Sequence, residues 1–101
     1  MPKEKIERSE AILREKRNTR KGLQMRNNIL AFLFKNNSKN FTTQEIAEGT
    51  GYTNESTSYH LKNLLAENVV TKNIFNRKNS WQITGLGQQT IKKWLEKNGN
   101  P

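Results

Sequence analysis

A run of short polar side chains lies between residues 53 and 63 of the chain. Hydroxyl groups hydrogen-bond well to phosphate oxygens, an asparagine amide can form two hydrogen bonds to adenine, and a tyrosine ring can pack on a thymine methyl group. The side chains with this chemistry, together with one lysine, are Thr53, Asn54, Ser56, Ser58, Tyr59, Lys62 and Asn63. They are candidates for a nucleic-acid contact, and the alternative is an ordinary solvated helix face.

A helix is needed to present these side chains together. At about 100° per residue, Thr57, Leu61 and Leu64 share one side, which we expect to face the core. The residues expected on or beside the outer face are Glu55, Ser56, Ser58, Tyr59, Lys62, Asn63 and Ala66. Glu55 can accept from a cytosine amine or favour the helix N-terminus electrostatically, and we prefer the second interpretation. The pattern predicts a helix over about residues 54–67 with a polar outer face.

A second group of candidate binding residues is basic. Residues 68–84 contain three cations and no acid, and these cations are Lys72, Arg77 and Lys78. A dense basic patch near the N-terminus adds Arg17, Arg20 and Lys21. The formal net charge of the whole chain is +9. A small protein with this charge is usually built to bind a polyanion such as DNA, RNA or an anionic membrane, although the charge can also serve only for solubility.

Several kinds of chemistry have no support in the sequence. The chain has no cysteine and a single histidine, His60, which excludes disulfides, thiolate metal sites and cysteine nucleophiles. No glycine-rich phosphate loop and no convincing carboxylate cluster is present. We therefore expect no enzymatic activity, no cofactor and no metal. Without a long apolar run or a signal-peptide core, the sequence predicts a cytoplasmic, nucleoid-associated protein that does not contact the membrane.

The periodicity of apolar residues predicts the elements that position these side chains. The predicted order is a core helix over 23–35, a short helix from a capping box at Thr42 and Glu45 to about Gly51, the helix at 54–67, a hairpin, and a last helix over 85–97. The hairpin consists of strands at 69–75 and 80–84 around a polar turn. Thr53 or Asn54 caps the third of these helices, and Asn68 tolerates the left-handed conformation where the chain turns. The fold class is mostly α with a small β-hairpin.

The N-terminal segment is less clearly defined by its sequence. Residues 1–21 form a basic arm or helix, because pairs such as Glu4 and Arg8 have the spacing of helical ion pairs. Gly22 interrupts the pattern, so we expect the domain proper to cover residues 22–98. The arm can contact the DNA backbone, flank a dimer interface through Ile6, Ile12 and Leu13, or be a disordered tail.

Residues 46–70, which read IAEGTGYTNESTSYHLKNLLAENVV, resemble the winged-helix core of the ArsR/MarR-type prokaryotic transcription regulators. The family pattern is roughly IAxxTGLSxSTVSxHLKxLxxxGLV, and the later ITGLG at 83–87 is similar to the family's LTxxG. The resemblance covers about residues 25–97. Asn68 stands where the family usually has glycine, and the arm lies outside the resemblance.

The resemblance implies a winged helix-turn-helix fold and a homodimeric transcription regulator. The recognition helix, at about 54–67, would enter the major groove of double-stranded DNA, and the wing, residues 69–84, would lie on the backbone or in the minor groove. The N-terminal, first and last helices, with Trp94 and Leu95, would form the dimer.

Two other functions fit the same residues. A sequence-neutral architectural or chromatin protein would explain a high charge combined with a weakly decorated recognition helix. A winged helix can also serve as a protein-interaction module of a transcription or replication assembly, because a fold does not dictate a function. RNA is a less suitable partner, since its deep and narrow major groove does not admit a helix.

Overall fold

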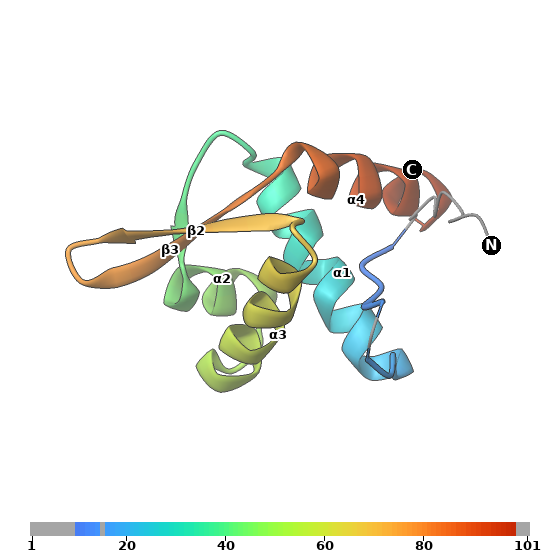
Figure 1. Cartoon of the computed structure of the whole chain (residues 1–101), viewed down its shortest axis with the longest axis horizontal. Helices are drawn as coiled ribbons and strands as arrows, with labels where there is room; N and C mark the ends of the chain where they lie inside the picture. The colour runs from blue at the N-terminus through green and yellow to red at the C-terminus, as the bar shows by residue number, and fades with distance from the viewer. Residues whose placement is uncertain (1–9, 15, 99–101) are drawn as a thin grey trace.

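The computed structural model describes residues 10–14 and 16–98, and it contains four helices and three strands in that part of the chain. In chain order they are α1 (Arg20–Lys35), β1 (Phe41–Thr42), α2 (Thr43–Thr50), α3 (Asn54–Ala66), β2 (Val70–Phe75), β3 (Lys78–Ile83) and α4 (Gly85–Asn98). Figure 1 shows the β2–β3 hairpin projecting from the helices, with α1 lying between α3 and α4. This arrangement is a winged helix-turn-helix, as the sequence predicts.

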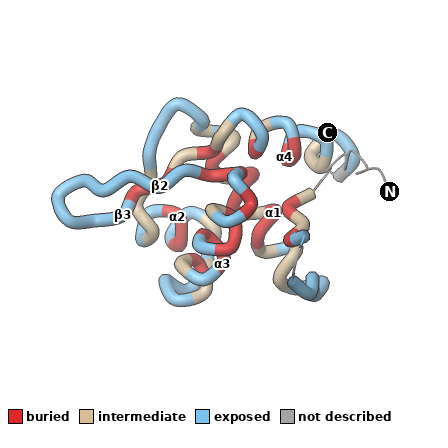
Figure 2. Tube along the Cα trace, in the orientation of Figure 1, coloured by how far each residue is buried: buried red, intermediate tan, exposed pale blue. Residues whose placement is uncertain are grey.

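The helices and the root of the hairpin share one hydrophobic core. Its fully buried side chains come from α1, α2, α3, the β2–β3 hairpin and α4, and they include Ile29, Leu30, Leu33, Ile46, Leu61, Leu64, Val69, Val70, Trp81 and Ile91. Figure 2 shows burial concentrated where α1, α3 and α4 meet, whereas the outer part of the hairpin is exposed. The core therefore holds α3 by its apolar side and leaves the wing outside.

The sheet has three antiparallel strands in the order β1-β3-β2, rather than the two strands that the sequence predicts. Phe41 pairs with Trp81 and Thr42 with Ser80. A strand of two residues is too short to produce an alternating pattern, so its pairing depends on the distant β3 and not on its own sequence. β1 fixes the start of α2 against the hairpin.

The wing has a tighter turn than expected. The strands extend to Phe75 and restart at Lys78, so that the turn contains only Asn76 and Arg77 instead of the four residues 76–79. Both turn residues have positive φ, 49° and 67°. This is the conformation of a two-residue turn whose twist matches that of the flanking strands.

The predicted ends of α2 and the predicted start of α3 are confirmed. Thr42 and Glu45 form a reciprocal capping box at the start of α2, and Gly51 ends that helix with φ 82°. Thr53 caps α3 by accepting from the backbone N–H of Ser56. Asn68 has φ 63°, the left-handed conformation expected of it.

The N-terminal part of the chain differs from the prediction. α1 begins at Arg20, where Thr19 accepts from the backbone N–H of Gly22, so Gly22 lies in the first turn and the proposed division between residues 21 and 22 falls inside a helix. The described residues of the arm before Thr19 form no helix. The pair Glu4 and Arg8 and the side chain of Ile6 lie outside the described residues. The described residues of the arm instead make tertiary contacts with α1 and with the C-terminal end of α3.

Candidate nucleic-acid interface

The turn between α2 and α3 fixes the direction in which α3 leaves the body of the protein. Gly51 adopts the left-handed conformation, and the Tyr52 side chain is anchored because Asn28 Nδ2 donates to its hydroxyl oxygen at 2.7 Å. Thr53 then accepts from Ser56 N at 3.1 Å and starts the helix. Three consecutive residues therefore set the angle between the two helices of the motif.

The outer face of α3 is open to solvent over its first nine residues. Asn54, Glu55, Tyr59 and Lys62 are exposed, and 59% of the surface of Tyr59 is accessible. Ser56 and Ser58 are half-buried. A shallow hollow of about 560 Å³ runs between this face and the start of α2, and its lining residues are Thr43, Gln44, Asn54, Glu55, Ser58, Tyr59 and Lys62. Hydroxyl, amide and ammonium groups thus surround a surface wide enough for another molecule.

Asn63 does not belong to this face, and the expectation that it flanks the outer surface is wrong. Only 6% of the residue is exposed. Lys16 Nζ donates to its Oδ1 at 2.9 Å. Asn63 follows Lys62 by a rotation of about 100°, which turns it toward the side of α3 that the N-terminal arm covers. Helical geometry alone could not show that this side is covered.

The described residues of the arm, 10–14 and 16–19, dock onto α1 and α3 of the same chain. Ala11 is held at both its backbone groups: its N–H donates to Asn27 Oδ1 at 2.8 Å, and its carbonyl accepts from Arg26 Nε at 2.9 Å. Asn18 closes a loop by accepting from Leu13 N and donating to Leu13 O, both at 2.9 Å. Ala11 and Leu13 are buried. The burial of Leu13 within its own chain removes it from the dimer contact expected of it.

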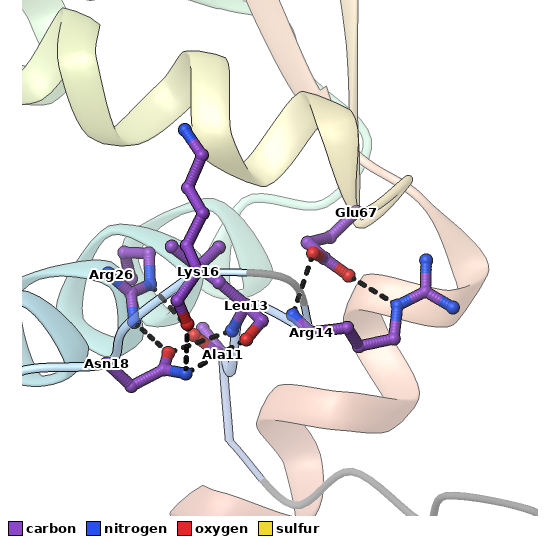
Figure 3. A network of polar contacts seen from close by, with 7 residues as sticks. All are labelled: Ala11, Leu13, Arg14, Lys16, Asn18, Arg26 and Glu67. Atoms are coloured by element: carbon purple, nitrogen blue, oxygen red, sulfur yellow. Dashed lines mark hydrogen bonds and ion pairs between the residues drawn. The ribbon is translucent and has the colours of Figure 1, made fainter.

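An ion pair ties the arm to the end of α3. Arg14 N donates to Glu67 Oε2 at 3.0 Å, and Arg14 Nε donates to Glu67 Oε1 at 2.9 Å (Figure 3). Glu67 is only 8% exposed. One sequence signal could have pointed to this docking: the polar pair Arg26 and Asn27 lies in the middle of an apolar helix. Buried polar groups need partners, and the arm supplies them.

A buried polar strip lies between α3 and the N-terminal half of α1. Thr57, His60 and Asn63 are spaced at three residues on α3 and are all buried. The pKa of His60 lies below its ordinary value of 6.5, first because burial disfavours its charged form and second because of the positive charge of Arg26. Burial also lowers the pKa of the Arg26 guanidinium. His60 is thus a buried side chain beside a buried cation, in surroundings that disfavour its charged form.

The wing carries exposed cations and two exposed apolar side chains. Lys72, Arg77 and Lys78 are all exposed, as the sequence predicts. Ile74 and Phe75, which precede the turn, are 69% and 61% exposed. The root of the wing is rigidly attached, since Trp81 Nε1 donates to Thr43 Oγ1 of α2 at 3.0 Å.

The basic residues at the start of α1 lie close to the start of α3. Arg17, Arg20 and Lys21 are exposed. Lys21 lines a hollow of about 380 Å³ that Thr53 and Ser56 also line. Figure 1 shows the N-terminal ends of α1 and α3 at the same, lower end of the molecule. The structure therefore brings part of the basic arm to the residues predicted to contact nucleic acid.

Neither a metal-binding cluster nor a bilayer-spanning helix occurs in the described part of the chain. No group of three or more histidine, cysteine or acidic side chains there could hold a metal ion. No helix within residues 10–14 and 16–98 combines the length and the apolar character needed to cross a bilayer.

No protein-family model matches the sequence, and no curated protein matches it. Solved structures do match. MepR, a transcription regulator of the Staphylococcus aureus multidrug efflux pump MepA, is 17% identical over 73% of this chain and 56% of the MepR chain, with a TM-score of 0.68. The complex of S. aureus MepR with DNA matches at 16% identity over 75% of this chain and 68% of that chain, with a TM-score of 0.65. S. aureus MepR bound to ethidium bromide matches at 17% identity over 83% and 59%, with a TM-score of 0.63.

This chain spans little more than half the length of the MepR chains in several of these structures. At identities of 16 to 18%, the likeness establishes a shared winged-helix fold and nothing finer. The residues that contact a ligand must therefore be argued from this chain itself.

Proposed function

We propose that this chain binds double-stranded DNA and acts as a transcription regulator. The observation that carries the proposal is the exposed polar face of α3, which follows a tight left-handed turn and is flanked by an acid-free, cationic wing. A single helix fits the major groove, where each base pair presents a distinct pattern of donors and acceptors. A solved structure with the same fold, that of MepR, is a complex with DNA, which supports the choice of ligand.

Different parts of the interface have different roles in this proposal. Base edges and nearby phosphates are contacted by side chains of α3 and of its N-cap. These side chains are Thr53, Asn54, Ser56, Ser58, Tyr59 and Lys62. The wing cations Lys72, Arg77 and Lys78 contact phosphates or the minor groove. Arg17, Arg20 and Lys21 add phosphate contacts beside the start of α3. Asn63 is not among the contacts, because it is buried.

The functional unit in this proposal is a two-fold homodimer formed through α1, α4 and the N-terminal segment. Leu86 on α4 is 44% exposed, and Trp94 and Leu95 near the end of α4 are half-buried. An interface built on this helix would extend the core between two copies. Such a dimer reads a palindromic site whose half-sites lie about one or two helical turns apart.

Selection of random duplex DNA against the purified protein at about 150 mM salt tests the proposal. We expect enrichment of a palindromic motif, which also gives the half-site spacing. Tight retention of every duplex without enrichment would instead indicate a sequence-neutral architectural protein. The weakly charged recognition helix, with one cation and two acids in residues 54–67, would suit that role. Loss of all duplex binding even at low salt would refute DNA binding and favour a protein-interaction module.

A further inference from the structure

The recognition helix proposed above lacks the charge that its ligand calls for. Residues 54–67 contain Lys62 as their only cation, against Glu55 and Glu67. A helix in the major groove lies between two phosphate backbones, and most hydrogen bonds of such interfaces go to phosphate and sugar. The groups that neutralise these phosphates must therefore come from elements that lie beside α3.

The docked arm runs along one side of α3. Arg14 contacts Glu67 at the C-terminal end of the helix, and Lys16 contacts Asn63 one turn earlier. Lys21 shares a hollow with Thr53 and Ser56, at the N-terminal end. At 1.5 Å per residue the interval from residue 53 to residue 67 is about 21 Å. The arm, continued by the first turn of α1, thus runs antiparallel to α3, with Arg14 and Lys16 beside the C-terminal end of α3 and Lys21 near its N-terminal end.

Among the described residues, no ion pair neutralises the arm's other cations. Between described residues, the ion pair of the arm is that of Arg14 with Glu67. Lys16 Nζ rests on the neutral amide of Asn63 and is exposed. Arg20 and Lys21 stand in the first turn of α1, which has no acidic residue. Cations there oppose the positive end of the helix dipole, so their position does not serve the stability of α1.

Two uncharged side chains, Asn18 and Asn27, help to hold the arm in place, beside the Arg14–Glu67 ion pair and the contacts of Arg26. Asn18 accepts from Leu13 N and from Arg26 Nη2 at 2.7 Å, and its amide nitrogen donates to Leu13 O and Lys16 O (Figure 3). Asn27 holds Ala11 from α1. The arm therefore loses its backbone freedom when the chain folds and not when a ligand binds. Its cations are already in place when a ligand arrives.

We propose that the docked arm is a preformed phosphate-binding rail beside α3, in which Lys16, Arg17, Arg20 and Lys21 contact the DNA backbone and Asn18 and Asn27 are positioning residues. The inference rests on the proposed function, because it names the side of α3 on which one backbone lies. It differs from a flexible basic tail in one respect: the contribution of the cations depends on uncharged asparagines that do not touch DNA.

A double-mutant cycle on the full-length chain tests this dependence, with duplex affinity measured as a function of salt. The charge variant is Lys16→Gln with Arg17→Gln, and the anchor variant is Asn18→Ala, which removes no charge. Each lost phosphate contact lowers the slope of log K against log salt by about 0.9, so two lost contacts correspond to a roughly tenfold difference over a fourfold change in salt. Lys35→Gln with Lys39→Gln, at the other end of α1, is the matched charge control.

We expect Asn18→Ala to lower the salt slope although the net charge of the chain is unchanged. The combined variant should lower the salt slope by no more than the larger of the two decreases seen in the separate variants. The control pair should retain the slope of the wild type. An Asn18→Ala variant that binds like the wild type, or losses that simply add, would overturn the rail. A wild-type chain that retains no duplex at low salt would instead overturn the proposed function itself.

Hydrogen exchange on the wild-type chain gives an independent reading if Asn18→Ala unfolds. In the docked arm, the amides of Ala11, Leu13 and Arg14 donate to the side chains of Asn27, Asn18 and Glu67, respectively. Their protection should rise when a duplex is added, because the ligand stabilises the docked state. Unchanged exchange at all three amides in the presence of bound duplex would overturn the proposal.

Discussion

Replacement of Arg77 by glycine should stabilise the protein while weakening its binding to DNA. Arg77 occupies the second position of the two-residue wing turn with φ 67°. The left-handed conformation costs an ordinary residue about 1–2 kcal/mol, whereas glycine adopts it without that cost. Glycine has more freedom to lose on folding, an opposing contribution of about 0.5–1 kcal/mol. The central values of the two ranges leave a gain of roughly 0.5–1 kcal/mol.

Thermal unfolding measures this gain. For a domain of about 60–100 residues, 1 kcal/mol moves the Tm by about 4–8 °C, so Arg77→Gly should melt roughly 2–8 °C above the wild type. Arg77→Gln is the matched control, because it removes the same charge but keeps a side chain in the left-handed conformation, and its Tm should equal that of the wild type. Both variants should lower the salt slope of duplex binding by about 0.9.

The two measurements separate two parts of the reasoning. A Tm of Arg77→Gly at or below that of the wild type would refute the account of the turn. Equal stabilisation by Gln would show that loss of charge, and not relief of the backbone, is responsible. Unchanged DNA binding in both variants would remove Arg77 from the interface and leave the stability argument intact.

Three further predictions follow from burial, backbone conformation and charge. The pKa of His60 is lowered in the folded state, so His60 contributes stability that is fully present above its ordinary pKa of 6.5 and is lost as the pH falls through the lowered value. Chemical denaturation between pH 7.5 and 5 should show this loss of stability, and the loss should be smaller in His60→Gln. An equal loss in the variant and the wild type would contradict the role of His60. Gly51→Ala should lower the free energy of unfolding by about 1–2 kcal/mol, because residue 51 has φ 82°. No atom lies within 4 Å of an added Cβ, so backbone conformation and not crowding is the cause, and Gly51→Asn should lower the free energy of unfolding by less. Equal losses for the two variants in urea titrations would indicate crowding instead. Phe75→Ser should change the free energy of unfolding by no more than about 0.5 kcal/mol because the side chain is largely exposed, and a loss well above that in the same assay would mean that Phe75 is packed.

Features whose causes lie within a few residues could be predicted from the sequence. The capping box of Thr42 and Glu45, the left-handed Gly51 and the cap at Thr53 each depend on neighbours three or four positions away. Helical periodicity likewise placed Tyr59 and Lys62 on the exposed face of α3.

Features that depend on distant contacts could not be predicted in this way. The partner of Arg14 is 53 residues away, and Ala11 is held by a residue 16 positions along the chain. Charge spacing in the arm favours a helix, but the backbone groups of Ala11 bond to α1 and the amide of Arg14 bonds to Glu67 at the end of α3. Asn63 was misplaced for the same reason, since its burial comes from a segment that the helix pattern does not contain.

The position of β2 at the edge of the sheet affects how copies of this chain meet. β1 covers one side of β3 for only two residues, and β2 leaves its outer edge unpaired within the described sheet. Exposed edges of this kind are templates on which a second chain can add a strand, and Ile74 and Phe75 would favour such pairing. Lys72, at the middle of the strand, Arg77 in the turn and Lys78 at the start of β3 oppose it by like-charge repulsion. The side chains proposed to contact DNA therefore also protect an unpaired strand edge against aggregation, and this protection weakens as salt screens their charges.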